Sequence, residues 1–384
     1  MNLNKNKVAF IILNDPMTFP PTINAAEILS KNGFQIDIFS LRNIYETKIT
    51  VPPNVNIYYF GILKGGLYYR IKFFTMIVNV LYQSLKNKYK WIFAYNMTST
   101  LPAYLAAKLV GSKLLYHNHD DTIIKNKFSF YGFLKMVEVY VARKANIVSY
   151  PQKQRADFFF KHAKLLNKPL IVKNGPLKTW TTKYKKSKSK YDYLKKKYRK
   201  ILLYQGGLNW KRGIENILKI MRHMEDDVGL LLIGKIYNDK YFQNEFEKLI
   251  IKYKIKKKVV LFPPVSYNEI PFITEICDIG FGVMADKSDN DSFNIEYLAG
   301  ASNKLVEYMA FGKPCIVPKN KTYLEYIVKN DLGICIDVKD PQESAKRITS
   351  LLNDNNQYQK ISDECLKYFG SEGFFEAPFN KILY

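Results

Sequence analysis

A glycine-rich turn beside a basic loop is the strongest chemical signal in the sequence. In YQGGLNWKRGIENIL (204–218), an apolar run ends in Gly206 and Gly207, the loop after them carries Arg212, and Gly213 opens a segment of helical period. Glycines let backbone N–H groups approach an anion, and a helix N-terminus with adjacent cations completes a phosphate cradle. The alternative is an ordinary tight turn, because glycine turns that lead into helices are common in α/β proteins.

A second segment with the same potential is GASNKLVEYMAFGKPCIVP (300–318), in which a loop of small residues precedes a short helix. Ser302 is predicted to cap that helix, and Lys304 and Glu307, three residues apart, share one helix face. Two interpretations are open. Either the two residues form a surface ion pair, or Lys304 and the loop amides hold a diphosphate while Glu307 accepts two hydrogen bonds from a ribose diol.

The composition narrows the class of partner and the compartment. A net charge of +25, carried mostly by lysines, indicates an anionic ligand or lipid but no specific nucleic acid, since lysine binds as a point charge. The four cysteines form no CxxC pair, which predicts neither a zinc site nor disulfides. Without a leader-like segment or about 18 successive apolar residues, the chain is predicted to be cytoplasmic and not membrane-spanning.

Short apolar runs alternate with segments of helical period along the whole chain. Because most of the runs are apolar throughout rather than alternating, they suit strands buried on both faces of a parallel sheet. Helices are predicted between them, with Gly33 and Gly111 at their C-terminal ends. The predicted strands are 7–13, 34–41, 54–61, 90–96, 113–119, 145–151 and 170–175 in the first half, and 200–206, 228–234, 259–265, 278–284, 314–318 and 333–338 in the second.

This order predicts an α/β protein of two Rossmann-like, doubly wound domains that face each other across a cleft, where open α/β sheets bind ligands. The domains are placed at 1–175 and 201–367, joined by a basic inter-domain crossing at 176–200. Residues 368–384 are predicted to be a helix that returns toward the first domain.

Taken together, these segments resemble the retaining glycosyltransferases of family 4 (glycosyl transferases group 1), which have the GT-B fold. The family turn "YxGxLxxxKGIExLI" is similar to residues 204–218, and its signature "SPNKLFEYMAxGKPVI" is similar to SNKLVEYMAFGKPCI (302–316). Its "VxNG" domain exit resembles IVKNG (171–175), and its closing segment resembles residues 324–354. Order and spacing agree over about 150 residues.

The resemblance implies an acceptor-side domain at 1–175 and a nucleotide-sugar donor domain at 201–367. Arg212 matches the family's basic residue on the donor diphosphate, and Glu307 matches the carboxylate on the nucleotide ribose. Arg212 and Lys304 would neutralise the departing diphosphate. The full donor-binding set is Gly206, Gly207, Arg212, Ser302, Asn303, Lys304, Leu305 and Glu307.

Two positions depart from the family pattern. At the first, many members carry an arginine where this chain has Gly207. The second concerns the donor sugar. Most members carry a sugar-contacting glutamate eight residues before Glu307, where this chain has Ala299. The segment NIEYLAGASNK (294–304) instead resembles a subgroup in which Asn and "NK" replace that glutamate, and Asn294 is a candidate on the acceptor side. The departure leaves the donor sugar open.

The first domain supplies two further candidates. The family's sugar-contacting histidine is best matched by His119 in LLYHNHDD (114–121), with His117 as the alternative, although a lone histidine at a strand end is more often structural. Asp15, in a proline-rich loop on the acceptor side, is a candidate base that activates the acceptor. An Asp in a turn more often bonds the local backbone.

The resemblance implies transfer of a sugar from a nucleotide diphosphate sugar, a UDP-sugar, to a hydroxyl of a glycan or lipid-linked glycan in cell-surface polysaccharide synthesis. Anomeric configuration is retained, and no metal or other cofactor is required. Two alternatives stay open. One is another GT-B activity such as a nucleotide-sugar 2-epimerase, and the other is a catalytically degenerate module that binds polyanions or membranes.

A predicted helix at 67–86 bears on the acceptor. It is apolar nearly all round, with Ile71, Phe74 and Val78 on one stripe and basic residues at both ends. Either it is buried within its domain, or it is an interfacial helix that enters the headgroup region of an anionic membrane. The second interpretation predicts peripheral association with the inner face of the cell membrane, beside a lipid-linked acceptor.

Overall fold

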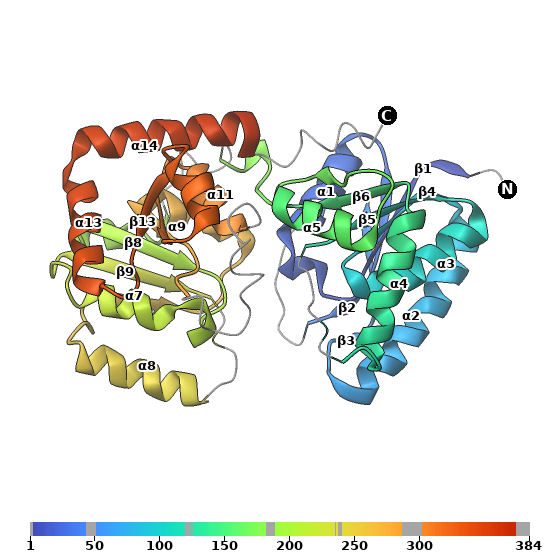
Figure 1. The fold of residues 1–384 in the computed structure, drawn as a ribbon, viewed down its shortest axis with the longest axis horizontal. Helices are drawn as coiled ribbons and strands as arrows, with labels where there is room; N and C mark the ends of the chain where they lie inside the picture. The colour runs from blue at the N-terminus through green and yellow to red at the C-terminus, as the bar shows by residue number, and fades with distance from the viewer. Residues whose placement is uncertain are drawn as a thin grey trace. The chain divides into compact units, whose positions relative to one another are not determined.

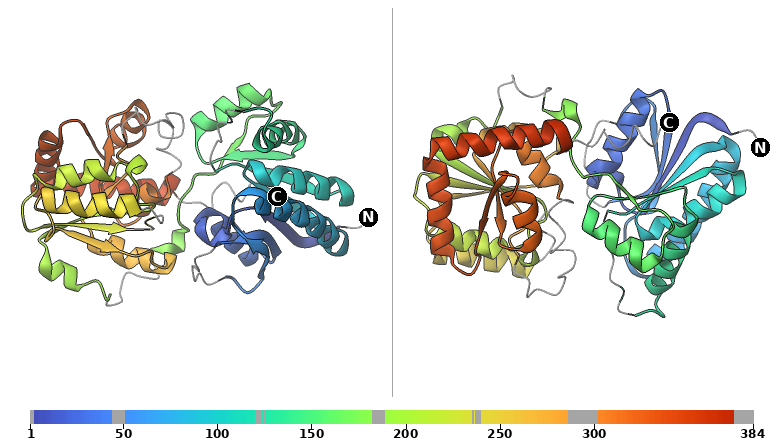
Figure 2. Two further views of the ribbon diagram at one scale, coloured as in Figure 1. Left: turned by 90° about the horizontal axis from the view of Figure 1, so that it is seen from below. Right: turned by 45° about the horizontal axis from the view of Figure 1, so that its top comes forward.

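The computed structural model describes residues 3–43, 51–119, 124, 126–181, 189–234, 236, 240–285 and 302–373. The chain divides into two compact units, unit 1 up to Lys173 and unit 2 from Asn174. Each unit is built on a parallel sheet with helices packed against it (Figure 1, Figure 2). This architecture confirms the predicted α/β fold class.

The described part of unit 1 contains one seven-stranded parallel sheet. Residues 8–12 of one inner strand are buried, since Val8 to Ile12 are 1% exposed or less, and Phe10 stacks on Phe93 of the neighbouring strand at 4.9 Å between ring centroids. The order across the sheet is β3 (Val55–Ile62), β2 (Gln35–Arg42), β1 (Asn4–Ile12), β4 (Tyr89–Tyr95), β5 (Lys113–His117), β6 (Ile147–Tyr150) and β7 (Leu170–Ile171).

Helices connect these strands, and α3 lies between α2 and α4 on the sheet (Figure 1). As predicted, glycines with positive φ stand where two of the helices end, Gly33 at 81° and Gly111 at 79°. The helices are α1 (Pro20–Lys31), α2 (Gly66–Asn87), α3 (Thr100–Val110), α4 (Phe130–Lys144) and α5 (Lys153–Ala163), with short turns η1 (Pro16–Thr18) and η2 (Met97–Ser99).

The long helix α2 is neither fully buried nor fully exposed. It packs Phe73, Met76 and Val80 into the core of unit 1, while Ile71, Phe74 and Val78 remain exposed on the opposite side. The helix is therefore not buried as a whole, because an all-round apolar helix can bury one side only against a sheet. The interfacial interpretation stays a prediction. Within the described ranges, no helix is long and apolar enough to cross a membrane.

The described part of unit 2 contains a six-stranded parallel sheet. Its order is β10 (Val259–Phe262), β9 (Val228–Ile233), β8 (Lys200–Gln205), β11 (Ile279–Phe281), β12 (Cys315–Pro318) and β13 (Gly333–Ile336). Its helical segments are η3 (Lys178–Trp180), α6 (Tyr193–Lys197), η4 (Trp210–Arg212), α7 (Ile214–Met221), α8 (Lys240–Lys252), η5 (Tyr267–Glu269), α9 (Ile270–Ile276), α11 (Asn303–Met309), α12 (Lys321–Tyr323), η7 (Leu324–Val328), α13 (Pro341–Asn353), α14 (Asn355–Tyr368) and η8 (Phe369–Gly373).

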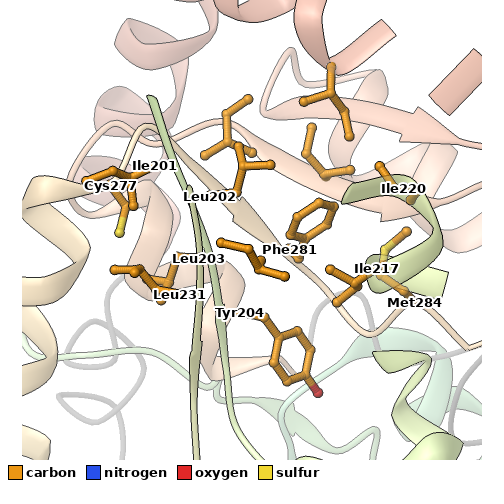
Figure 3. Close-up of a cluster of buried hydrophobic side chains, with 14 of the residues drawn as sticks. Ile201, Leu202, Leu203, Tyr204, Ile217, Ile220, Leu231, Cys277, Phe281 and Met284 are labelled. Carbon is orange, nitrogen blue, oxygen red and sulfur yellow. The ribbon is translucent and has the colours of Figure 1, made fainter. Parts of the chain in front are cut away.

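Both sheets have a point at which the strand order reverses, between β1 and β4 in unit 1 and between β8 and β11 in unit 2. Ligands of α/β sheets bind at the carboxyl ends of the strands next to such a point. In unit 2 the strands at this point are anchored by a large apolar core. Figure 3 shows part of it, with Leu203 of β8, Phe281 of β11 and Ile217 of α7 pointing into one interior.

The segment expected as an inter-domain crossing, 176–200, belongs to unit 2 wherever it is described. Trp180 packs against Val306, and Leu194 and Tyr198 are part of the unit 2 core. The prediction missed these apolar side chains because lysines dominate the segment. Their spacing lets one side of the segment be buried. At the C-terminus, the described chain continues past α14 through η8, and the remainder of the predicted helix at 368–384 lies outside the described residues.

Candidate active site

The glycine turn of unit 2 closes directly over a lysine. β8 ends at Gln205, and Gly206 follows with a φ of 130°, which favours glycine. A Cβ atom on Gly206 would lie 3.0 Å from the Nζ of Lys304. The two predicted segments, far apart in the sequence, are therefore brought together at the carboxyl end of β8.

The loop after the turn has a fixed shape that presents Arg212 to solvent. The Asn209 side chain accepts a hydrogen bond from the Arg212 backbone N–H at 3.0 Å. Gly213 has a φ of 75°, and a Cβ atom there would lie 2.1 Å from the carbonyl carbon of Met284. Only glycine fits this close approach of two backbones, so the position of Arg212 is set by packing rather than by its own side chain.

Lys304 lies over an aromatic ring. Its Nζ is 3.9 Å from the centroid of Tyr204, whose hydroxyl donates to the carbonyl of Gly207 at 3.2 Å. Burial lowers the pKa of the Lys304 ammonium well below its usual value, and the charge of Arg212 lowers it further, while Glu307 opposes the shift. Two cations that disfavour each other in this way are stabilised by an anion bound between them.

Glu307 is buried, with 5% of its surface exposed. Its carboxylate accepts a hydrogen bond from the side-chain amide of Gln205. Burial raises the pKa of the Glu307 carboxyl to about 7, although hydrogen bonds from Tyr267 and Gln205 and the charge of Lys304 act in the opposite direction. The interpretation of Lys304 and Glu307 as a surface ion pair is therefore wrong, because one partner is inside the protein.

The other residues predicted around α11 differ in what the structure shows of them. Ser302 occupies the N-cap of α11, but its side chain makes no capping hydrogen bond within the described residues, contrary to prediction. Asn303 begins the helix and is partly exposed, whereas the side chain of Leu305 is fully buried in the core, so only its backbone is available to a ligand. Asn294 and Ala299 lie outside the described residues.

In unit 1, the two candidate histidines lie at the end of β5 and touch each other, with 4.5 Å between ring centroids. The His119 backbone N–H donates to the side chain of Asn96 at 2.9 Å, and its ring lies parallel to that of Tyr95. His117 is bonded to Ser149, and burial, together with His119, lowers the pKa of its imidazole. His117 thus has structural partners within the strands, and His119 lies nearer the end of the sheet.

A pocket of about 400 Å³ lies beside His119, at the carboxyl ends of β1, β3 and β4. Phe19 and Asn96, which line it, both contact His119. The remaining lining residues come from the ends of strands and the starts of α2 and α4, and they include one amide and two aromatic side chains. They are Asn14, Leu63, Lys64, Gly65, Tyr69, Met97, Thr98 and Tyr131.

Asp15 is held in a structural role close to this pocket. Its carboxylate accepts hydrogen bonds from the backbone N–H groups of Met17 and Asn43, at 3.1 and 2.8 Å, and from the Tyr59 hydroxyl at 3.2 Å. These bonds join the loop after β1 to the ends of β2 and β3. The geometry favours the local backbone role over that of an acceptor-activating base.

Three residues that contact or interact with the predicted donor-binding residues were not predicted from the sequence: Gln205, Tyr204 and Tyr267. Gln205 and Tyr204 are the last residues of β8, and their position just before the glycine pair was the signal that could have indicated them. Tyr267 lies in η5, outside either motif, and no spacing indicates it. Within the described ranges, no group of His, Cys, Asp and Glu side chains is placed to hold a metal ion.

Residues 185–367 match the family model "Glycosyl transferases group 1". This stretch contains the glycine turn, Lys304 and Glu307, so the matched domain is the one that carries the unit 2 site. No curated protein matches the sequence.

Solved structures resemble the whole chain at low identity. HepE of Anabaena, in complex with UDP and glucose, is 16% identical with a TM-score of 0.71, over 98% of each chain. WaaG, a glycosyltransferase involved in lipopolysaccharide biosynthesis, is 13% identical with a TM-score of 0.69, over 97% of this chain and 98% of the other. A UDP-N-acetylglucosamine 2-epimerase is 14% identical with a TM-score of 0.62, over 99% of this chain and 95% of the other.

At such identities the likeness shows the fold, which is GT-B. With this fold, the group 1 domain at residues 185–367 identifies the protein as a glycosyltransferase.

Proposed function

We propose that the protein is a retaining glycosyltransferase of family 4 that transfers a sugar from a UDP-sugar to a hydroxyl of a glycan or lipid-linked glycan. It acts without a metal ion, in the cytoplasm at the inner face of the cell membrane, in the synthesis of a cell-surface polysaccharide. The observation that carries the proposal is the cluster of Gly206, Arg212, Lys304 and Glu307 within the group 1 domain.

Each part of this cluster suits one part of a nucleotide diphosphate. Arg212 and Lys304 supply positive charge for the phosphates, and the glycine turn lets the backbone approach them. Glu307 offers a carboxylate to the two hydroxyls of a ribose, and the bond from Gln205 fixes its orientation. That HepE binds UDP and glucose in the same fold supports the choice of a uridine donor.

In the proposed reaction, the bond from the sugar C1 to the diphosphate oxygen breaks as the acceptor oxygen bonds to the same carbon. The acceptor attacks from the face of the leaving group, and its proton passes to the departing diphosphate. Arg212 and Lys304 stabilise the negative charge that develops there, which is the largest contribution expected of the protein. His119 positions the sugar, and the unit 1 pocket receives the acceptor.

The lining of the unit 1 pocket supports a saccharide as acceptor. The side-chain amides of Asn14 and Asn96 each offer both a donor and an acceptor, which matches sugar hydroxyls, and the rings of Phe19, Tyr69 and Tyr131 offer apolar faces to a pyranose. Among the described residues that line this pocket, Lys64 is the only cation. The lining therefore suits a neutral sugar better than a second nucleotide.

A thermal-shift panel of UDP-, GDP- and ADP-sugars tests the proposal. At 100 times its Kd, the cognate donor should add about 2.7 kcal/mol to the free energy of unfolding. The Lys304→Ala protein is the matched control, and it should lose most of the shift. Equal shifts in both proteins would contradict the assignment of the unit 2 site.

A further inference from the structure

We infer that Asn96 is a positioning residue of the candidate active site, which fixes His119 and joins it to the unit 1 pocket. The inference rests on the proposed function, in which His119 positions the donor sugar. Asn96 belongs to no motif of the sequence, and it follows β4, whereas His119 follows β5.

The backbone of Asn96 is strained. It turns the chain out of β4 with a φ of 64° and a ψ of 166°. This combination is not the left-handed helical conformation that asparagine often adopts, but a region essentially restricted to glycine. A residue with a Cβ atom stays there only where its surroundings fix it, and such residues cluster at active sites.

The strained turn lets the side chain of Asn96 replace its own carbonyl in the sheet. β4 and β5 are paired with Tyr95 opposite His117, and the Asn96 backbone N–H continues this pairing by donating to the His117 carbonyl at 2.9 Å. The next bond of a regular parallel ladder would join the Asn96 carbonyl to the His119 N–H. Instead, that carbonyl accepts from the Ser99 N–H at 3.1 Å, and the Asn96 Oδ1 accepts from the His119 N–H at 2.9 Å.

The remaining contacts of His119 complete its fixed position. Arg155, which is fully buried, donates a hydrogen bond to the His119 carbonyl at 2.9 Å. The imidazole contacts the rings of Phe19 and Tyr95, with centroids 5.6 and 5.7 Å away. Both backbone polar groups of His119 are therefore bonded, and Asn96 supplies the bond at the N–H. A site group held in this way by its neighbours is preorganised for a substrate.

Asn96 also lines the unit 1 pocket. Its Oδ1 is bonded to His119, whereas its Nδ2 has no hydrogen-bond partner among the residues that the structure describes. An amide nitrogen can donate two hydrogen bonds, so this end of the side chain is available to a sugar oxygen. One residue thus connects the group proposed to position the donor sugar with the pocket proposed for the acceptor.

Paired substitutions test the strain. Asn96→Ala and Asn96→Gly both lose the bond to His119, but only glycine relieves the backbone, so the glycine variant should unfold about 2–5 °C above the alanine variant. Asn320 is the matched control, because its Oδ1 also accepts a backbone N–H, that of Tyr323 at 2.8 Å, while its φ of −144° is ordinary. There, glycine should unfold below alanine. An Asn96→Gly protein that unfolds at or below Asn96→Ala would overturn the inference.

Proton–carbon NMR of the His119 ring tests the positioning without any substrate. The protein has four histidines, and the His119 signal is the one that disappears in His119→Ala. Asn96→Asp keeps an oxygen for the His119 N–H, so it should show one sharp signal, as the parent should. Asn96→Ala should shift or broaden the signal, because the ring is no longer held in one position. An Asn96→Ala protein with the parent's His119 signal would contradict the positioning role.

Hydrolysis of a UDP-sugar without an acceptor separates this test from the proposed function. Asn96→Ala and Asn96→Gly should lower kcat by about ten- to a hundredfold and change the donor KM by less than about threefold, because a misplaced group acts mainly on the transition state. Asn96→Asp should be faster than either. Parental kcat in both variants would overturn the inference and leave the transferase proposal intact. A parent that hydrolyses no UDP-sugar would contradict the proposed donor, while the unfolding temperatures and the His119 signal would still decide the inference.

Discussion

Replacing Glu307 by glutamine should make the free protein more stable above neutral pH. Burial raises the pKa of the Glu307 carboxyl from 4.5 to about 7, so the folded protein holds this proton more tightly than the unfolded chain does. The protonated carboxyl of Glu307 therefore adds to the free energy of unfolding. This contribution is fully present below pH 4.5 and is lost as the pH rises through 7. The difference in pKa corresponds to about 3 kcal/mol lost above pH 7.

Glutamine at position 307 keeps the shape of the side chain and an oxygen for the bond from Gln205, but it cannot ionise. The gain in the free energy of unfolding should therefore be about 2 kcal/mol larger at pH 8.5 than at pH 5. Urea unfolding at the two pH values, followed by circular dichroism, measures this difference. Glu247→Gln, on the exposed side of α8, is the control.

The same substitution should weaken donor binding, because an amide offers one acceptor oxygen where the carboxylate offers two. Loss of one charge-assisted hydrogen bond to the ribose should raise the donor KM by about tenfold or more. A variant that gains stability at high pH but binds UDP like the parent would show that the buried carboxylate of Glu307 lowers stability without contacting the nucleotide. Equal stability changes at pH 5 and pH 8.5 would refute the argument from its buried ionisation.

Substitutions of the other site residues should each have a different effect. Arg212→Ala and Lys304→Ala should each lower kcat/KM by about one to three orders of magnitude while the protein stays folded, and parental turnover in both would mean that the phosphate site lies elsewhere. His119→Ala should lower kcat more than it changes the donor KM, whereas an inactive, well-folded His117→Ala with an active His119→Ala would reverse the two roles. Asp15→Ala should destabilise unit 1 by about 1–3 kcal/mol without abolishing donor hydrolysis, and loss of transfer alone at full stability would restore Asp15 as the acceptor base.

The sheets were predictable because their strands are apolar throughout. Every predicted strand, from 7–13 to 333–338, overlaps a strand of the structure, although several observed strands are shorter, such as β11. The order of the strands across each sheet could not be predicted from these apolar runs. It depends on where each connecting helix places the next strand, and the runs do not indicate this. Residues 176–200 were placed outside a domain because a high density of lysine masked the apolar positions between them.

The candidate site was predictable in part for a similar reason. The glycine turn and the segment with Lys304 were recognisable because backbone constraints and cations restrict the residue types there. The partner of Glu307 was not, because Gln205 is a strand residue whose direction depends on the pleat and the neighbouring helix. The exposed stripe of α2 could not be told from its buried side, since both are apolar and only packing against the sheet distinguishes them.

The most direct test of the proposed transfer is proton NMR of the sugar first released when the protein hydrolyses an α-configured UDP-sugar without an acceptor. A retaining transferase that uses the Lys304 site should release the α anomer first, and the Lys304→Ala protein should release little sugar. Release of the β anomer first would contradict retention. Appearance of a 2-epimer would instead support the epimerase alternative, and no release from any UDP-sugar would contradict the proposed donor.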